Sequence, residues 1–278
     1  MAQLSLLSWN VAGRVRRLAE QIAFLAGQAP DLVALQEVRA HTVPDWRAGL
    51  RQAGLPYAVD SFALAADPTL LTGPRRYGEL LAARWPLTPL APGDFPVPWP
   101  ERVLSALLAS PWSEIEVHTT HIPCGASHGT LKIETLEGLY RRLARPAARP
   151  RILCGDLNTP QAETPAGQIA TWGQDLAPDG APLPPPPGWE RWDHAERSVL
   201  AGLGAFDLPD IFRAVNGYGV ADYSWFLWRK GRCIARRRFD HVFASPALHA
   251  VACGYIQAPR EQGLSDHAPI VAQFCCRG

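Results

Sequence analysis

Four short segments, far apart along the chain, place acid, amide or imidazole side chains directly after apolar runs. Ser8-Trp9-Asn10 closes one run near the start, and Gln36-Glu37 closes the run Leu32-Val33-Ala34-Leu35. Gly155-Asp156-Leu157-Asn158 and Ser265-Asp266-His267 repeat this arrangement further along. Such an apolar run predicts a buried strand, and a carboxylate that closes it should point into a cleft rather than into the core. The pattern is typical of a hydrolytic site assembled from strand ends.

The first two segments offer oxygen atoms that can hold a metal ion. Asn10 and Glu37 each follow an apolar run. Amide and carboxylate oxygens are hard ligands that suit Mg²⁺ or Mn²⁺, and these ions commonly take only one or two carboxylates from a protein. Taken alone, Asn10 equally suits a turn after a strand, and Glu37 the start of a helix.

The third segment carries two polar side chains with a spacing of two. Asp156 and Asn158 follow the apolar run Ile152-Leu153-Cys154. In an extended chain, residues two apart point to the same side, so both side chains can face one pocket. An Asx turn leading into Thr159-Pro160 is a second interpretation, and it is compatible with the first.

Strands and helices must bring these residues together. Strand-like runs occupy residues 4–9, 32–37, 79–83, 103–110, 115–121, 151–155, 239–244, 251–257 and 270–275. Apolar residues at helical spacing predict helices at 16–26 and 131–143, with Thr130 as the cap of the second. Strands joined partly by hairpin-length links and partly by helices predict a mixed α/β sandwich.

We expect one domain over residues 1–278, because the candidate site residues run from Asn10 to His267. The stretch 178–188 includes four consecutive prolines, Pro184 to Pro187. Prolines in a row cannot hold a helix or a central strand, so this stretch predicts an extended surface insertion.

Six segments resemble those of the endonuclease/exonuclease/phosphatase superfamily, the family of deoxyribonuclease I. They are LSLLSWNVAG, DLVALQEV, TTHIP, RILCGDLNTP, RRRFDHVFAS and GLSDHAPIV. All six occur in the expected order over nearly the whole chain. The resemblance implies a two-sheet mixed β-sandwich flanked by helices, the four-layer sandwich of deoxyribonuclease I. It also implies phosphoester hydrolysis with Mg²⁺ or Mn²⁺ as cofactor.

The resemblance implies a role for each acid and amide. Glu37 would be the principal metal ligand, and Asn10 would orient it or bind a phosphate oxygen. Asp156 would orient or deprotonate the attacking water, and Asn158 would hold a phosphoryl oxygen. Asp266 would help to bind the metal.

One histidine near the end of the chain completes this set. His267 resembles the family histidine that contacts the scissile phosphate or takes part in proton transfer. An imidazole in that role needs a partner on its other nitrogen, and Asp240 stands in the matching position. We therefore expect a contact between Asp240 and His267.

Further residues resemble the deoxyribonuclease I and sphingomyelinase branches. His121 matches their second catalytic histidine, and Tyr77 and Glu79 match a tyrosine and the glutamate that partners this histidine. Arg102 resembles an arginine that binds substrate phosphate, since a guanidinium can grip two oxygens at once. The alternatives are an edge-strand glutamate for Glu79 and a solvated strand-end charge for Arg102.

The stretch 223–238 interleaves aromatic residues with cations, a composition that suits a nucleic-acid groove. It also suits a hairpin that packs its aromatic face on the sandwich and turns its basic face to solvent. The residues concerned are Trp225, Phe226, Trp228, Arg229, Lys230, Arg232, Arg236, Arg237 and Arg238.

Composition limits the partners of the chain. The formal net charge is +1, so there is no global basic footprint for nucleic acid and any phosphate-binding surface must be local. The chain begins without a basic segment followed by a long apolar run, and its six cysteines form no CxxC pair. We expect a cytoplasmic protein without membrane insertion and without an obligate protein partner.

Together these features predict a divalent-metal-dependent phosphodiester hydrolase that activates water for in-line attack. Diesters are favoured over monoesters because two candidate histidines allow a leaving alkoxide to be protonated. Nucleic acid, DNA or RNA, is the first choice of substrate, which makes the protein a nuclease. The alternatives are a phosphoesterase of a phospholipid, an inositol phosphate or another small phosphoester, and a non-catalytic binding scaffold of the same fold.

Overall fold

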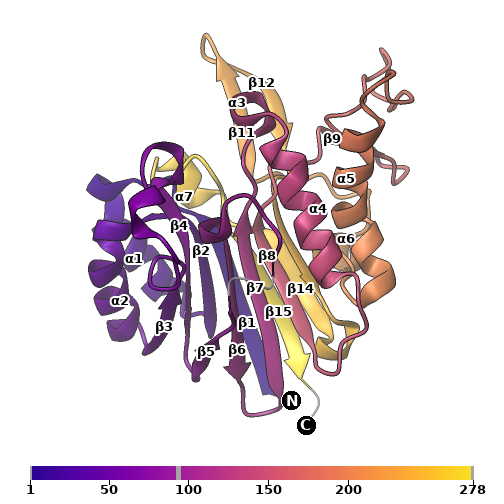
Figure 1. The fold of residues 1–278 in the computed structure, drawn as a ribbon. Coiled ribbons are helices and arrows are strands. Elements are labelled where there is room, and N and C mark those ends of the chain that lie inside the picture. Colours follow the sequence, from indigo (N-terminus) through magenta and orange to yellow (C-terminus); the bar gives the residue numbers. More distant parts are fainter. Residues whose placement is uncertain (1, 92–94, 277–278) are drawn as a thin grey trace.

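The computed structural model describes residues 2–91 and 95–276. Two β-sheets face each other, and helices cover their outer faces (Figure 1). The first sheet contains β1 (Ala2–Asn10), β2 (Leu32–Arg39), β3 (Tyr57–Asp60), β4 (Tyr77–Ala83), β14 (Ala250–Tyr255) and β15 (Ile270–Cys276). The second contains β5 (Leu87–Pro89), β6 (Val103–Ala109), β7 (Glu114–His121), β8 (Arg151–Asp156) and β13 (Asp240–Ala244).

The spatial order is β14-β15-β1-β2-β4-β3 in the first sheet and β13-β8-β7-β6-β5 in the second. Two short hairpins, β9 (Ala162–Glu163) with β10 (Ile169–Ala170) and β11 (Trp225–Arg229) with β12 (Arg232–Arg237), lie outside these sheets. The helices are α1 (Leu18–Gln28), α2 (Val43–Gln52), α3 (Gly125–His128), α4 (Leu131–Leu143), α5 (Glu190–Leu200), α6 (Ile211–Asn216) and α7 (Ala258–Glu261). The expected mixed sandwich with helices on both sides is confirmed.

The layers form because the central strands carry apolar residues on both faces. In β1, Leu4 and Leu6 pack between the two sheets, whereas Leu7 and Trp9 pack on the opposite side. Successive strand residues point to opposite faces, so a strand that is apolar throughout can be covered on both sides.

The outer faces are closed by amphipathic helices. Leu25 of α1 and Trp46 of α2 belong to the cluster that covers the first sheet. Leu136 and Leu139 of α4 and Val199 of α5 belong to the cluster that covers the second. Figure 1 shows α1 and α2 on one side of the sandwich and α4 and α5 on the other.

The predicted helix over residues 131–143 has those bounds and Thr130 stands at its N-cap position, but it does not cap the helix through its side chain. Thr130 has helical angles, φ −63° and ψ −18°, and its side chain makes no capping hydrogen bond. The short helix α3 ends at Gly129, whose φ of +55° and ψ of −131° reverse the chain, and Thr130 then starts the helical backbone of α4. The other predicted helix starts as a 3-10 turn, Val15–Arg17, and continues as α1.

The proline-rich stretch lies on the surface as expected. Every residue from 178 to 188 is exposed or half-buried, and none belongs to a helix. In the part of the chain that the structure describes, no helix combines the length and the apolar character needed to cross a membrane.

Strand pairing brings the polar segments to one edge of the sandwich. β1 runs parallel to β2, so Asn10 lies beside Gln36, and β7 runs parallel to β8, so His121 lies beside Asp156. The antiparallel strand β13 begins there too, with Asp240 opposite Asp156. Parallel strands end at the same edge, which is the physical reason why distant segments of the chain meet.

Candidate active site

Glu37 reaches the site through an irregularity in β2. Its φ is +57°, and the pairing of β2 with β4 shifts register between Leu35 and Val38. A bulge of this kind bends a strand and turns a side chain away from its regular direction. The carboxylate therefore faces the site from within the strand, and not from the strand end that the sequence suggested.

Asn10 holds two carboxylates in place. Its Nδ2 donates to Oε1 of Glu37 at 3.0 Å and to Oδ2 of Asp156 at 2.9 Å. Its Oδ1 accepts from the backbone N–H of Ala12. Asn10 thus presents nitrogen to the carboxylates, so its geometry favours a clamp between Glu37 and Asp156 over a direct metal ligand.

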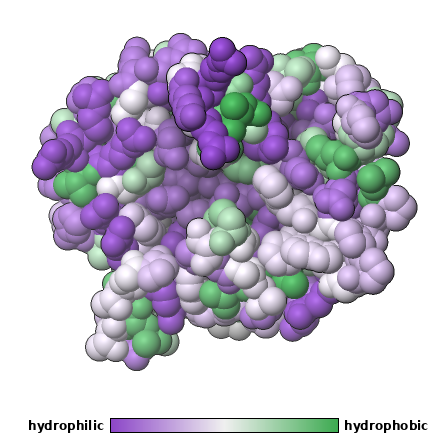
Figure 2. All heavy atoms as spheres, turned by 90° about the horizontal axis from the view of Figure 1, so that it is seen from above, coloured by the Kyte–Doolittle hydropathy of each residue, from purple (hydrophilic) through white to green (hydrophobic). Residues whose placement is uncertain are grey.

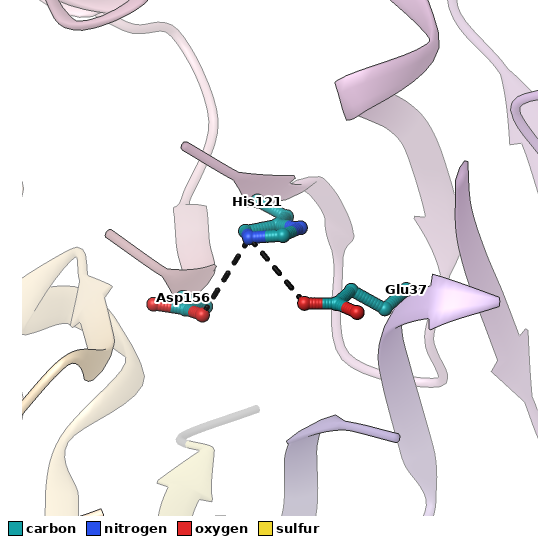
Figure 3. A group of neighbouring side chains, drawn as sticks. All are labelled: Glu37, His121 and Asp156. Atoms are coloured by element: carbon teal, nitrogen blue, oxygen red, sulfur yellow. Dashed lines mark ion pairs between the residues drawn. The ribbon is translucent and has the colours of Figure 1, made fainter. Parts of the chain in front are cut away.

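His121 lies against both clamped carboxylates (Figure 3). Its Nε2 is 3.6 Å from Oε1 of Glu37 and 3.7 Å from Oδ2 of Asp156. The ligand atoms of these three residues all lie within 4.8 Å of one another. His121 and Asp156 are buried, and Glu37 is half-buried, so the cluster opens to solvent on one side.

The protonation state of His121 follows from its other nitrogen. Nη1 of Arg102 contacts Nδ1 of His121, and a guanidinium can only donate. Nδ1 must therefore accept, which places the imidazole proton on Nε2. Burial lowers the pKa of His121 well below its ordinary value, and the charge of Arg102 lowers it further. His121 is a neutral donor that points Nε2–H at the two carboxylates, and in this tautomer it cannot ligate a metal through Nε2.

Glu79 does not partner His121 through a hydrogen bond. Its carboxylate is fully buried, and neither oxygen has a hydrogen-bond partner among the residues described. Burial raises its pKa well above the ordinary value, although the charge of Arg102 opposes this shift. The expected carboxylate–imidazole pair is replaced by Arg102, because the guanidinium occupies the imidazole nitrogen that Glu79 would need.

The expected contact between Asp240 and His267 is present. Nδ1 of His267 lies 2.7 Å from Oδ2 of Asp240, and Nε2 lies 3.7 Å from Oδ2 of Asp156. Burial alone would lower the pKa of His267, but the charges of Asp240 and Asp156 outweigh it and raise the pKa. Burial raises the pKa of Asp156, and the charge of His267 opposes this rise. Asp156 thus lies between two imidazoles, one neutral and one cationic.

The backbone after β8 directs Asp156 and Asn158 into the site. Gly155 has φ +135°, and a Cβ there would lie 2.0 Å from the carbonyl oxygen of Thr120, so only glycine fits. The backbone N–H of Asn158 donates to Oδ1 of Asp156 at 2.8 Å, which forms the expected Asx turn. Nδ2 of Asn158 donates to the Ile122 carbonyl at 2.9 Å and lies 3.4 Å from Nε2 of His121.

A buried ion pair supports this loop from behind. Nζ of Lys132 donates to Oε1 of Glu196 at 2.5 Å and to the carbonyl of Asn158 at 3.0 Å. Oε2 of Glu196 accepts from Thr159 Oγ1 and from the backbone N–H of Trp172. Neither Lys132 nor Glu196 was expected near the site. Lys132 shares a helical stripe with Leu136, so its spacing already indicated a buried lysine that needs an acidic partner.

Two predicted residues lie at the edge of the site. The Asp266 carboxylate is 52% exposed and faces Arg14 at 3.9 Å, so it lies outside the clustered ligand atoms. Tyr77 lines the same cavity, and the guanidinium carbons of Arg76 and Arg102 lie 4.8 and 5.6 Å from its ring centroid.

The site opens into a cavity of about 690 Å³. Seen from above, the surface is hollowed near its middle and hydrophilic residues line the floor (Figure 2). One side of the cavity is formed by rings that we call the aromatic wall: Trp172, Trp189, Trp192, Trp225 and Phe239. Of these five residues, only Trp225 was expected near the site. Trp172, Trp189 and Trp192 lie on either side of the four prolines, and this concentration of tryptophan was the signal that could have indicated them.

The hairpin β11–β12 contributes to the cavity with one face only. Trp225 pairs with Arg237 and Leu227 with Ala235, and these four residues line the cavity. The hairpin projects from the sandwich (Figure 1), and Trp228 on its other face is 57% exposed. Of the two interpretations of this stretch, packing of the aromatic face on the sandwich is therefore wrong for Trp228.

Arg238 is not a groove cation. It is buried, donates to Glu163 at 2.7 Å and to Asp210 at 2.8 Å, and shares Glu163 with Arg213. Burial alone would raise the pKa of Glu163, but hydrogen bonds and charges from Arg238 and Arg213 lower it to about 2. These ion pairs tie the segment just before β13 to β9 and to the N-cap of α6.

The donor set fits a hard divalent cation. Glu37 and Asp156 turn one oxygen each toward a shared space, and each of these oxygens accepts one hydrogen bond from Asn10. Mg²⁺ is commonly bound by one or two carboxylates together with substrate phosphate. Asp156, Asp240 and His267 form a second group of ligand atoms within 4.8 Å of one another, but in it Nδ1 of His267 is engaged by Oδ2 of Asp240.

Comparison with known proteins places these features in context. The sequence model of the endonuclease/exonuclease/phosphatase family matches residues 7–267. No curated protein matches the chain. Among solved structures, an AP endonuclease from Archaeoglobus fulgidus is 22% identical, with a TM-score of 0.69 over 98% of this chain and 99% of that chain.

Two further solved structures have the same fold. A 3'-5' exonuclease from Neisseria meningitidis is 21% identical, with a TM-score of 0.66 over 98% of this chain and 99% of that one. TDP2 of D. rerio, complexed with a single-strand DNA product, is 17% identical, with a TM-score of 0.65 over 99% of this chain and 100% of that one.

Proposed function

The chain belongs to the endonuclease/exonuclease/phosphatase family, and from this we propose that it is a divalent-metal-dependent phosphodiester hydrolase acting on nucleic acid. One observation carries the proposal. The Asp156 carboxylate lies 3.7 Å from each of two imidazoles, His121 and His267, and is clamped to Glu37 through Asn10.

Asp156 is the group that accepts a proton from the attacking water. Its pKa is raised by burial, so the carboxylate is a stronger base than an exposed aspartate. The Asx turn and the Asn10 amide fix both of its oxygens, which directs the remaining lone pairs toward the cavity. A water bound at these lone pairs would be held next to the carboxylate that takes its proton.

Glu37 and Asp156 would hold Mg²⁺ or Mn²⁺ at the open side of the cluster. When bound, such a cation would polarise a phosphoryl oxygen and offset the charge that develops in the transition state. Asn10 orients both carboxylates for this purpose, and its loss would leave two like charges side by side.

The remaining polar groups act on the phosphate. His267, protonated and oriented by Asp240, can donate to a phosphoryl oxygen or give a proton to the leaving alkoxide. His121 directs its Nε2–H at Glu37 and Asp156, so the donor for a phosphoryl oxygen is the Asn158 amide, 3.4 Å from that nitrogen. Fixed donors of this kind stabilise developing negative charge, commonly by a few kcal/mol each.

Nucleic acid is supported as the substrate by the likeness to the three nucleic-acid enzymes named above and by the cations beside the cavity, Arg102 and Arg237. A small phosphoester is the second candidate, because the cavity is bounded and the net charge is only +1. The two differ in salt dependence. Counterion release predicts a steep fall of activity with salt on DNA or RNA, and little change on a small substrate.

The test is a panel of substrates with Mg²⁺, Mn²⁺ or chelator: single- and double-stranded DNA, RNA, sphingomyelin, inositol phosphates and bis(p-nitrophenyl) phosphate. We expect metal-dependent cleavage of a nucleic acid that falls steeply with salt and is abolished by Asp156→Asn and His267→Ala. Activity that survives both substitutions would refute the assignment of this site. If the purified protein cleaves nothing and yet retains a binding partner after Asp156→Asn, the scaffold alternative holds.

A further inference from the structure

We propose that the aromatic wall is a subsite for one flat aromatic ring carried next to the reacting phosphate. The ring would be an unpaired nucleobase or an aryl group of a small phosphoester. This inference rests on the proposed function, since it names the chemical class that the same cavity selects.

The rings of the wall lie in two groups. Trp225 stacks on Phe239 with centroids 5.4 Å apart and planes 28° apart, and Phe239 lies 6.5 Å from Trp172. Trp189 and Trp192 form a second pair at 5.4 Å. The rings come from the hairpin, the start of β13 and the segment that flanks the prolines, and all of them line the cavity beside Asp156.

The wall is connected directly to the catalytic loop. Nε1 of Trp172 donates to the carbonyl of Asn158 at 3.0 Å, and Nε1 of Trp192 donates to Glu196 at 2.9 Å. These bonds fix the orientation of two indoles and satisfy their only polar atoms. Trp172 nevertheless remains 38% exposed, and Trp189, whose ring contacts the fixed Trp192, is 46% exposed, so ring surface is left open to the cavity. Rigid, exposed rings of this kind are typical stacking platforms.

Charge beside the rings favours a base or aryl group over an acyl chain. Nζ of Lys132 lies 5.8 Å from the ring centroids of both Trp172 and Trp192, and the Arg237 guanidinium lies 5.6 Å from Trp172. The Arg237 guanidinium lines the cavity beside the wall and suits the polar edge of a heterocycle, whereas an acyl chain would gain nothing from it. The Lys132 ammonium is buried and already donates to Glu196 and to the Asn158 carbonyl, so it polarises the wall without reaching the ligand.

The volume of the cavity suits one small ligand. The cavity of about 690 Å³ lies within the usual range of pockets that enclose one small ligand. A base must leave its stack to enter such a pocket, so the substrate would present a strand end, a single strand or an extruded nucleotide.

The first experiment measures binding and does not depend on turnover. Calorimetric titrations with Mg²⁺ compare phenyl phosphate with cyclohexyl phosphate, two ligands of similar size of which only one is flat. We expect phenyl phosphate to bind about 5- to 100-fold more tightly, the range that stacking on aromatic side chains provides. Equal or tighter binding of cyclohexyl phosphate would overturn the proposal and indicate a general apolar pocket.

Variants locate the effect on the wall. Trp189→Ala should bring the phenyl-to-cyclohexyl ratio close to unity, because the Trp189 side chain is 46% exposed and its ring leans against that of Trp192 at the cavity. Trp225→Leu is the second test variant. Tyr57→Ala is the control, since Tyr57 is exposed and pairs with Ala83, at the other end of β4 from Tyr77. An unchanged ratio in both tryptophan variants would refute the subsite.

The second experiment separates the two sources of the ring. Single-stranded oligonucleotides carry one residue without a base at either side of the cleaved bond, and kcat/KM is compared with the intact strand. A fall of about 5- to 100-fold on one side, absent in Trp189→Ala, would identify the ring as a nucleobase. Faster cleavage of the strand without a base would contradict the inference while leaving the hydrolase assignment intact. Should no oligonucleotide be cleaved, tight binding of phenyl phosphate assigns the subsite to a small aryl phosphoester.

Discussion

Nδ1 of His267 lies 2.7 Å from Oδ2 of Asp240, and both side chains are buried. The two residues come from different sheets: Asp240 begins β13 in the second sheet, and His267 precedes β15 in the first. The pair fixes the orientation of the imidazole, so that Nε2 points toward Asp156.

Asp240→Asn should therefore impair catalysis more than binding. The asparagine keeps the shape of the site but removes the charge that stabilises protonated His267. We expect kcat to fall about 10²- to 10⁴-fold, the usual contribution of a positioned acid or base, with little change in KM. Steady-state kinetics on the best substrate of the panel measure both values. A fall in kcat/KM that comes only from KM would show that the pair serves binding.

The hydrogen bonds from Asn10 to Glu37 and Asp156 should strengthen Mg²⁺ binding. Without the amide, Glu37 and Asp156 lose the group that holds them in register. Asn10→Ala should raise the Mg²⁺ concentration for half-maximal activity about 10- to 100-fold, as is usual when a group that orients metal ligands is removed. Calorimetric titration of Mg²⁺ provides the same comparison without turnover.

Asp266→Ala is the matched control for the clamp. Its carboxylate is 52% exposed and lies outside the clustered ligand atoms, so we expect only a small change in Mg²⁺ affinity. A loss as large as that of Asn10→Ala would show that Asp266 joins the ligand set, as the sequence resemblance implies.

The buried Lys132–Glu196 pair should be costly to break on one side only. The two side chains are 2% and 0% exposed. Lys132→Met leaves the Glu196 charge buried without its cation, and such changes cost about 3–5 kcal/mol. Urea denaturation gives the free energy of unfolding. The double variant Lys132→Met with Glu196→Leu should recover part of the loss. A loss in the double variant equal to the sum of the losses in the two single variants would contradict a direct coupling.

We expect the Glu163 carboxylate to make the free energy of unfolding fall in acid. Its pKa is lowered to about 2 because Arg238 and Arg213 outweigh burial, whereas the ordinary value is 4.5. A lowered pKa in the folded state contributes stability that is present above the ordinary value and is lost as the pH falls from about 4.5 to 2. The contribution is about 3 kcal/mol. The free energy of unfolding of Glu163→Gln should depend less steeply on pH in this interval than that of the wild-type protein, and parallel curves would exclude this role.

Sequence reasoning located the strands and the residues that close them, because long apolar runs can be buried only between layers. It also placed Asp240 against His267, since a histidine in that role needs a partner. The bulge at Glu37 could not be foreseen, because a register shift depends on how β2 meets β4 and not on the composition of β2.

Two other features of the site depend on how distant segments meet in the folded chain. Arg102 takes the His121 nitrogen that Glu79 was expected to use, and the sequence spacing of the three residues cannot rank these partners. The aromatic wall was missed because its rings come from separate segments that become neighbours only after folding.

The hydrogen bond from Asn10 to Asp156 joins the last residue of β1 to the last residue of β8, and these strands belong to different sheets. Turnover therefore depends on the relative alignment of the two layers. A small shear between them would separate the reactive groups while each sheet stayed folded. Catalytic competence is thus a more sensitive gauge of that alignment than any spectroscopic measure of strand content.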